Sequence, residues 1–225
     1  MNFQVEGKGS SLRFEPQALI IAGFTGRSRA KVQEHIDEMR AHGVPIPGAV
    51  PTFYPVPQSL ATTARAIEVA TVESSGEVEP VLIAQGDKWY ITLGSDHTAR
   101  DEEKIDIATS KAACPKILCT DVWLYEEVRP HWDKLELRSW AFENGVRTPY
   151  QHGTCADIMK LDELVAELQR RVHSMPRDFI MCMGTLPLIP GKFIYSNRYE
   201  FELKDPVLNR AFTLGYDVRV NARGG

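Results

Sequence analysis

The hydrophobic positions of this chain recur at two spacings, which predict two kinds of secondary structure. Short apolar runs rich in Val, Ile, Tyr and Trp predict β-strands through most of the length. The first run covers residues 18–22 and ends at Gly23, and others fall within residues 67–96, 134–150 and 178–220. The pattern therefore predicts a protein that is mostly β.

Turn residues divide two of these regions into hairpins. Gly86 and Asp87 interrupt the first region within residues 85–88, and the tripeptide Glu-Asn-Gly interrupts the second at residues 143–145. Asn-Gly is the dipeptide that tight hairpin turns favour, because both residues accept a positive φ. The sequence predicts one β-hairpin around each turn.

Two segments show the three- to four-residue spacing of an amphipathic helix. They are residues 27–43, where Gly43 marks the expected C-terminus, and residues 160–174. Between the first helix and the next strands, residues 44–57 contain five prolines, which predict an extended, rigid loop. The expected buried stripes are Val32, Ile36 and Met39 in the first helix, and Leu161, Leu164, Leu168 and Val172 in the second.

Together these elements predict one domain over residues 1–225, of the α+β class but mostly β, with two notable helices. The composition is that of a soluble globular protein, 43% hydrophobic and 25% charged, with a net charge of −4. This balance indicates no nucleic-acid and no membrane partner. The sequence has no long apolar run and no secretory signal, so a cytoplasmic location is expected.

The four cysteines lack the spacing of a zinc site, and in a reducing compartment buried free thiols are expected. They are Cys114, Cys119, Cys155 and Cys182. Three histidines have no evident partner in the sequence and are interpreted as structural. They are His131, His152 and His173.

Glu77 and Glu79, in the segment "GEVEPVLI", are the first candidates for chemistry. Residues two apart on a strand point to the same side, so the two carboxylates would lie together. Burying two like charges is costly unless a cation lies between them. The pair is therefore either a solvated face, which is the simpler interpretation of these two residues alone, or part of a metal site.

A third carboxylate, Asp96, comes just past the second strand of the first hairpin. If residues 77–81 pair with residues 91–94, Asp96 returns close to Glu77 and Glu79. Three carboxylates suit a hard divalent cation such as Mg²⁺, Mn²⁺ or Ca²⁺. The spacing alone equally allows Asp96 to be a turn or N-cap residue.

Other polar residues have both a functional and a structural interpretation. His35 and Glu38 share a face of the first helix and could form a general base, although an exposed pair among charged residues is simpler. Lys111 could be a buried cation for an anionic substrate, or a loop lysine. Gly184 and Thr185 could bind a carboxylate through N–H groups and a hydroxyl, or could form only a turn.

Six segments, taken in chain order, resemble motifs of the fumarylacetoacetate hydrolase superfamily, which includes acylpyruvases and related hydratases and decarboxylases. The resemblance covers most of the chain. The segments are "HIDEM" with the following "FYPVPQSL", "GEVEPVLI", "SDHTARDEE", "SKAACPK", "NGVRTPYQHGTCADIM" and "RDFIMCMGTLP".

The resemblance implies the mixed β-sandwich roll of this superfamily and a homodimer. It implies that Mg²⁺, or else Mn²⁺ or Ca²⁺, is bound by Glu77, Glu79 and Asp96. It further implies that His35 and Glu38 activate water and that Lys111 takes part in catalysis. The substrate would be held by Arg100, Gly184 and Thr185.

The implied activity is hydrolysis of a C–C bond in a small 2-oxo or β-dicarbonyl acid, such as an acylpyruvate. The metal would polarise the 2-oxo group, the dyad would deprotonate water, and Lys111 would offset developing negative charge. Decarboxylation, tautomerisation or hydration would use the same metal. Two alternatives belong to other functional classes. One is a non-catalytic relative that binds a ligand, and the other is a β-rich domain whose carboxylates are solvated.

Four features depart from the superfamily pattern. Val56 stands where a lysine is usual, and Glu103 stands where acylpyruvases tend to carry glutamine. Lys111 lies closer to the Cys114-Pro115 pair than the superfamily lysine does, and the segment 79–96 is short, which implies a trimmed hairpin. The missing cation at Val56 favours a smaller or less anionic substrate.

Overall fold

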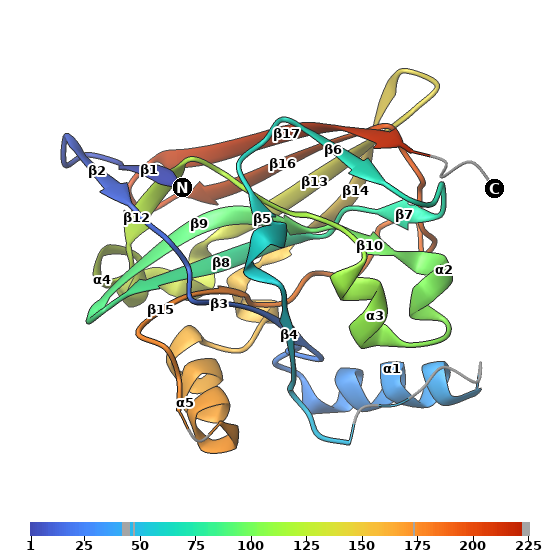
Figure 1. Ribbon diagram of the computed structural model, residues 1–225, viewed down its shortest axis with the longest axis horizontal. Helices are drawn as coiled ribbons and strands as arrows, with labels where there is room; N and C mark the ends of the chain where they lie inside the picture. The colour runs from blue at the N-terminus through green and yellow to red at the C-terminus, as the bar shows by residue number, and fades with distance from the viewer. Residues whose placement is uncertain (42–45, 47, 173, 222–225) are drawn as a thin grey trace.

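The computed structural model of the chain describes residues 1–41, 46, 48–172 and 174–221, without the side chains of His35, Glu38 and Met39. Strands dominate it, and Figure 1 shows β16 and β17 along one side of the molecule with α1 and α5 on the other side of the view. Within these residues no helix has the length and apolarity needed to cross a membrane. The prediction of a mostly β, α+β fold is confirmed.

The largest sheet has ten strands in the described residues, in the order β2-β1-β12-β9-β8-β15-β3-β4, with β11 paired to β9 and β5 paired to β11. Its strands are β1 (Asn2–Val5), β2 (Ser10–Arg13), β3 (Ala18–Gly23), β4 (Thr52–Val56), β5 (Ala61–Thr62), β8 (Val78–Gln85), β9 (Lys88–Asp96), β11 (Lys116–Leu118), β12 (Asp121–Leu124) and β15 (Asp178–Cys182).

A second sheet has the order β14-β13-β16-β17-β6, and a third sheet pairs only two short strands. The second sheet is formed by β6 (Ala66–Val69), β13 (Glu136–Glu143), β14 (Val146–Thr154), β16 (Arg198–Asp205) and β17 (Arg210–Val220). The short pair is β7 (Ser74–Ser75) with β10 (Thr98–Ala99).

The described α-helices are α1 (Arg29–Ala41), α2 (Arg100–Glu103), α3 (Ile107–Ala112), α4 (Tyr125–Val128) and α5 (Leu161–Arg171). Short 3₁₀ turns cover Gln58–Leu60, Arg129–Lys134 and Cys155–Asp157. The two helices expected from the sequence are α1 and α5. The three shorter helices were not expected, because four to six residues are too few to show a helical period.

Two hydrophobic clusters cover the two faces of strand β8. Val78, Leu82 and Ala84 join the larger cluster, which reaches the second sheet, while Val81 and Ile83 join a smaller cluster under β1 and β2. Side chains alternate along a strand, so a strand buried on both faces reads as a continuous apolar run. This explains the unbroken sequence "VLIA" and places β8 and its neighbour β9 in the middle of the molecule.

Both hairpins form where the turn residues predicted them. Strands β8 and β9 pair from Val78↔Ser95 to Gln85↔Lys88, and Gly86 in their turn has φ of 58°. Strands β13 and β14 meet at Asn144 and Gly145, whose φ values are 51° and 79°. Positive φ at both central residues is the signature of a type I′ turn, which the Asn-Gly sequence favours.

Two expectations about the helices and the proline-rich segment are wrong in detail. Thr52–Val56 is not a loop but the strand β4, which pairs with β3. Pro55 is compatible with this strand because β4 lies at the sheet edge, where no further strand needs a hydrogen bond from its missing N–H.

In α5, Leu161, Leu164 and Leu168 are buried as expected, but Val172 lies beyond the last helical residue and is exposed. Gly43, the expected end of the first helix, lies outside the described residues.

Candidate metal centre

Three carboxylates meet where β8 and β9 reach one end of their hairpin. Glu77, Glu79 and Asp96 each offer an oxygen, and the three oxygens lie within 4.8 Å of one another. Asp96 and Glu79 are buried, and 12% of the Glu77 side chain is exposed. The expected hairpin register therefore brings Asp96 to the glutamate pair, although Asp96 is the last residue of β9 rather than a residue beyond it.

Gly94 allows this close approach, because it is the residue paired with Glu79. A β-carbon at position 94 would lie 2.5 Å from Cγ2 of Val81 and 3.0 Å from the carbonyl oxygen of Ile117. Both distances are shorter than ordinary contacts, and β11 adds to the same strand from the other side. Any larger residue here would push apart the strands that carry Glu79 and Asp96.

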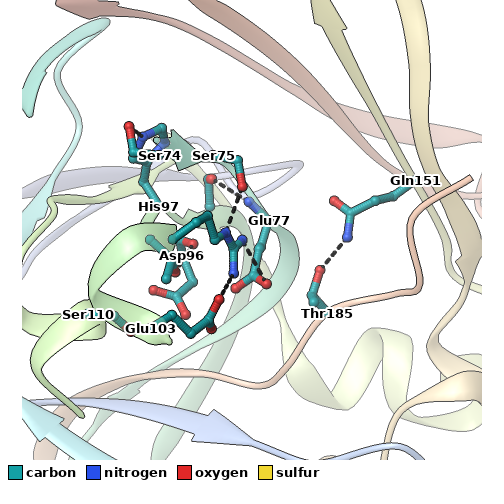
Figure 2. A network of polar contacts seen from close by, with 12 residues as sticks. Ser74, Ser75, Glu77, Asp96, His97, Glu103, Ser110, Gln151 and Thr185 are labelled. Carbon is teal, nitrogen blue, oxygen red and sulfur yellow. Dashed lines mark hydrogen bonds and ion pairs between the residues drawn. The ribbon is translucent and has the colours of Figure 1, made fainter. Parts of the chain in front are cut away.

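Cationic side chains surround two of the three carboxylates. Lys111 Nζ lies 2.8 Å from Glu77 Oε2 and 2.7 Å from Asp96 Oδ2. Lys116 Nζ lies 2.6 Å from Asp96 Oδ1, and Arg100 Nη2 lies 3.0 Å from Glu77 Oε1. Glu77 and Asp96 lie close together beside Glu103 in Figure 2. These ion pairs compensate the charge of a site that would otherwise be costly to bury.

The same cations determine the pKa values of the two carboxylates. Burial raises the pKa of Glu77, but the charges of Arg100 and Lys111 outweigh it, so the pKa of Glu77 is lowered. The pKa of Asp96 is also lowered, because Lys111 and Lys116 outweigh the effect of burial. Both groups are therefore ionised near neutral pH.

Glu79 differs from the other two carboxylates. Its Oε2 accepts a hydrogen bond of 2.8 Å from the backbone N–H of Gly184. Burial raises its pKa well above the usual range, and the charges of Asp96 and Glu77 raise it further. Glu79 is thus the carboxylate that gains most from an added cation.

The donor set fits a divalent ion. All three candidate ligands are carboxylates, the oxygens that Mg²⁺, Mn²⁺ and Ca²⁺ prefer. Both oxygens of Asp96 are buried and close to lysine nitrogens, yet neither has a hydrogen bond of good geometry within the described part of the chain. Buried oxygens with unused lone pairs are what a metal ligand offers.

The short helices α2 and α3 place Arg100 and Lys111 beside these carboxylates. Arg100, the first residue of α2, is buried and donates to Ser75 Oγ at 2.8 Å and to Glu103 Oε2 at 2.7 Å. The ring of Phe193 stacks on its guanidinium at 4.2 Å. Lys111 lies on α3, where it also donates to Thr98 Oγ1 at 3.1 Å.

The turn of Gly184 and Thr185 contacts strand β8, which carries Glu79. Gly184 N–H donates to Glu79, and Thr185 Oγ1 donates to the carbonyl oxygen of Val78 at 2.8 Å. The carboxylate bound by this turn in the described structure is therefore the protein's own Glu79. Their role in holding a substrate stays a prediction.

A protein-family model covers most of the chain. A family model described as "Protein of unknown function (DUF2848)" matches residues 22–216. The chain belongs to the DUF2848 family. No curated protein sequence matches it.

Solved structures similar to this DUF2848 chain share its fold at low sequence identity. A 2-keto-3-deoxyarabinonate dehydratase is 16% identical with a TM-score of 0.66, over 93% of this chain and 76% of the other. The yeast fumarylacetoacetate hydrolase family protein ynq8 is 16% identical with a TM-score of 0.62, over 93% and 95%. Maleylpyruvate hydrolase from Sphingobium sp. SYK-6 is 13% identical with a TM-score of 0.62, over 92% and 72%. The expected fumarylacetoacetate hydrolase-like fold is confirmed.

Two of the sequence-predicted residues of the DUF2848 chain cannot be placed. The backbone of His35 and Glu38 lies on α1, but their side chains are outside the described residues. Val56, by contrast, is buried in the smaller hydrophobic cluster and pairs with Leu19. Its side chain therefore contributes to the core. Position 56 supplies no positive charge to Glu77, Glu79 and Asp96.

Several residues that surround the carboxylates have no functional signal in the sequence. Lys116 reaches Asp96 because β11 pairs with β9 at Lys116↔Asp96, and it also donates to the carbonyl oxygen of His97 at 2.7 Å. His97 is buried, and burial together with the charge of Lys116 lowers its pKa to about 3, so its ring is neutral. Its two nitrogens contact Tyr216 and Ser74. No spacing in the sequence indicates these contacts, although His97 adjoins Asp96.

His131 has a partner that the sequence does not indicate. Its Nε2 lies 3.0 Å from Oδ1 of the buried Asp205. The two residues are far apart in the chain, so no local pattern could pair them. The exposed His152 agrees with a structural interpretation, and His173 lies outside the described residues. All four cysteines are buried and free, as expected.

Proposed function

We propose that this protein is a divalent-metal-dependent enzyme that acts on a small 2-oxo or β-dicarbonyl acid, and that it hydrolyses a C–C bond. The observation that carries the proposal is the buried cluster of Glu77, Glu79 and Asp96, whose oxygens lie within 4.8 Å of one another. The burial of this cluster argues against the alternative of three solvated carboxylates.

Mg²⁺, Mn²⁺ or Ca²⁺ held by these carboxylates would act as a Lewis acid on the 2-oxo group of the substrate. Lys111 keeps a positive charge beside the carboxylates, because Asp96 and Glu77 raise its pKa against the effect of burial. A positive charge beside the substrate stabilises negative charge that develops on it during bond cleavage. The expected contact of Arg100 with the substrate stays a prediction, and the ion pairs of Arg100 also hold Glu77 and Glu103 in place.

Water activation is assigned to His35 and Glu38, which are three residues apart on α1 and can share a face. A carboxylate that orients an imidazole makes a competent general base near neutral pH. In the view of Figure 1, α1 lies on the same side of the molecule as α2 and α3, which carry Arg100 and Lys111.

A second candidate reaction is dehydration of a 2-oxo acid at the same metal. It is favoured by the fold similarity to 2-keto-3-deoxy-D-arabinonate dehydratase, whose structure was solved in complex with magnesium and 2,5-dioxopentanoate. Glu103 also favours it, because its Oε1 lies 3.9 Å from Lys111 Nζ and adds a carboxylate beside the site. Decarboxylation and tautomerisation need the same Lewis acid and stay open as further outcomes.

The test is a screen of 2-oxo acids and acylpyruvates with Mg²⁺ or Mn²⁺, followed by enol absorbance and by product mass. Hydrolysis adds the mass of water and divides the substrate, whereas dehydration removes water. Metal-dependent turnover that Asp96→Asn abolishes would support the proposal. No turnover and no metal binding would overturn it.

The dyad is tested separately with His35→Ala, using Glu34→Ala on the same helix as a control. We expect His35→Ala to lose at least about 100-fold in kcat, the scale of general-base catalysis, while Mn²⁺ binding survives. Full activity of His35→Ala would contradict water activation by the dyad.

A further inference from the structure

The ammonium group of Lys111 lies between two carboxylates of the cluster, Glu77 and Asp96. It is 2.8 Å from Glu77 Oε2 and 2.7 Å from Asp96 Oδ2, so it bridges two of the three candidate metal ligands. Only 9% of its side chain is exposed. A metal ion that is coordinated by the same two carboxylates needs the same oxygens.

Every oxygen of Glu77 and Asp96 already lies beside a basic side chain. Glu77 Oε1 lies 3.0 Å from Arg100 Nη2, and Asp96 Oδ1 lies 2.6 Å from Lys116 Nζ. Together with the bridging Lys111, all four oxygens of Glu77 and Asp96 are thus paired with basic side chains. Arg100 and Lys116 each contact one of the candidate ligands, whereas Lys111 contacts two.

We propose that Lys111 is a tethered cation that fills the metal position when no metal is bound, and that the divalent ion displaces its ammonium group onto Glu103. The inference rests on the proposed metal site and adds that metal binding there is an exchange of cations. An ammonium and a divalent ion that share two carboxylates repel each other, so the two do not occupy the cluster together without a penalty.

Partners for the displaced ammonium are already in place. Lys111 Nζ lies 3.1 Å from Thr98 Oγ1 and 3.9 Å from Glu103 Oε1. Glu103 lies at the edge of the cluster with 21% of its side chain exposed, and its other oxygen is fixed by Arg100 at 2.7 Å. A rotation of the lysine side chain can therefore exchange the ligand carboxylates for Glu103 while the ammonium stays paired.

The exchange provides charge compensation in both states. Without a metal, Lys111 offsets the charge of buried Glu77 and Asp96, which would otherwise be costly. With a metal, the divalent ion compensates the three ligands, and the lysine charge moves to the edge of the cluster. The cost is a lower apparent affinity for the metal, because the ammonium competes for the same oxygens.

The first experiment compares Mn²⁺ binding to the unmodified protein and to Lys111→Met by titration calorimetry. We expect Lys111→Met to bind Mn²⁺ about tenfold or more tightly, because the competitor is gone, and to gain a larger Mn²⁺-dependent rise in melting temperature. Lys104→Met is the matched control, since Lys104 is exposed and pairs with Glu73 outside the cluster. It should bind Mn²⁺ as the unmodified protein does.

Equal or weaker Mn²⁺ binding by Lys111→Met would overturn the exchange, since Lys111 would then support the metal instead of competing with it. That result leaves the proposed function standing if the unmodified protein binds Mn²⁺. Absence of Mn²⁺ binding in both proteins would overturn the metal site and the exchange together. If Lys111→Met does not fold, Lys111→Gln serves in the same comparison.

A measurement on the unmodified protein needs no variant. We expect Mg²⁺ to increase the reaction of Lys111 with an amine-reactive reagent, read by peptide mass spectrometry, because the ammonium moves to the exposed edge. The buried Lys116 should stay unreactive and Lys104 should react equally with and without Mg²⁺. Unchanged labelling of Lys111 under conditions where Mg²⁺ is bound would contradict the displacement.

The role of Glu103 is tested by a double-mutant cycle. Glu103→Gln should weaken Mn²⁺ binding severalfold in the unmodified background, because the displaced ammonium loses its partner. In the Lys111→Met background the same substitution should have a much smaller effect. Equal effects in the two backgrounds would overturn the transfer to Glu103.

Discussion

At the residue scale, the charge of Glu79 lowers the stability of the metal-free protein, although the proposed metal site needs that charge. Among the described residues its carboxylate has one backbone donor, Gly184. Burial and the two neighbouring carboxylates raise its pKa well above the usual range. In the absence of a cation, an ionised Glu79 costs stability, and an uncharged isostere would keep the hydrogen bond without that cost.

We therefore expect Glu79→Gln to leave the melting temperature of the metal-free protein unchanged or raised, while Mn²⁺ binding falls about 100-fold or more. Calorimetry and thermal unfolding with and without Mn²⁺ measure both effects. Glu73→Gln, at a carboxylate outside the cluster that pairs with Lys104, is the control and should alter neither. A Glu79→Gln protein that kept its Mn²⁺ affinity would remove Glu79 from the ligand set.

At the element scale, Gln151 ties three segments together behind the carboxylates. Its Oε1 accepts from the N–H of Val78 and from Ser139 Oγ, both at 3.0 Å. Its Nε2 donates to Thr185 Oγ1 at 2.8 Å and to the carbonyl oxygen of Leu186 at 2.7 Å, and Figure 2 shows the contact with Thr185. Because Val78 stands between the two glutamates, this amide helps to determine where both carboxylates lie.

Gln151→Leu should destabilise the protein by about 2–4 kcal/mol, because it leaves several buried polar groups without partners. It should also weaken Mn²⁺ binding, since Glu79 and the Gly184 turn lose their common support. Urea unfolding and calorimetry test the two effects. His152→Leu, at the next and exposed position of β14, should change neither, and a Gln151→Leu protein of unchanged stability would refute the role of this amide.

At the scale of the whole molecule, a buried carboxylate links the second sheet to the segment after α4. Asp205, at the end of β16, accepts from the N–H groups of Val207 and Leu208 and lies 3.0 Å from His131 Nε2. Burial raises the pKa of Asp205, but the bonds from His131 and the Leu208 amide outweigh it, so the pKa is lowered from 3.8. A lowered folded-state pKa contributes stability above the unfolded-state pKa, and this stability is lost as pH falls through the folded value.

Asp205→Asn should therefore lower the free energy of unfolding by about 1–3 kcal/mol at pH 7. The difference from the unmodified protein should shrink below about pH 4, where the original Asp205 becomes protonated as well. Urea unfolding between pH 3 and pH 7 measures this, with Asp217→Asn at an exposed ion pair with Arg198 as the control. A stability difference that stays constant over this pH range would contradict the linkage.

The predicted homodimer can be tested by light scattering. The single-domain organisation stays a prediction.

Patterns that are local in the chain explain most of what could be predicted. The Asn144-Gly145 turn, the apolar strand β8 and the buried stripe of α5 follow from residues that are neighbours in sequence. The acidic cluster follows in the same way, because a two-residue spacing and one short hairpin are enough to bring Glu77, Glu79 and Asp96 together. Backbone geometry over a few residues determines such features, so sequence alone contains them.

Contacts between distant segments could not be predicted, because no spacing records them. The pairing of β11 with β9 brings Lys116 to Asp96, and the long-range hydrogen bonds of Gln151 reach Val78 and Thr185. Strand β4 forms from a proline-rich segment because a sheet edge is available to it. The sequence indicated which carboxylates come together, while packing of the sheets determined which cations compensate them. The charges in a buried cluster depend on every segment folded around it.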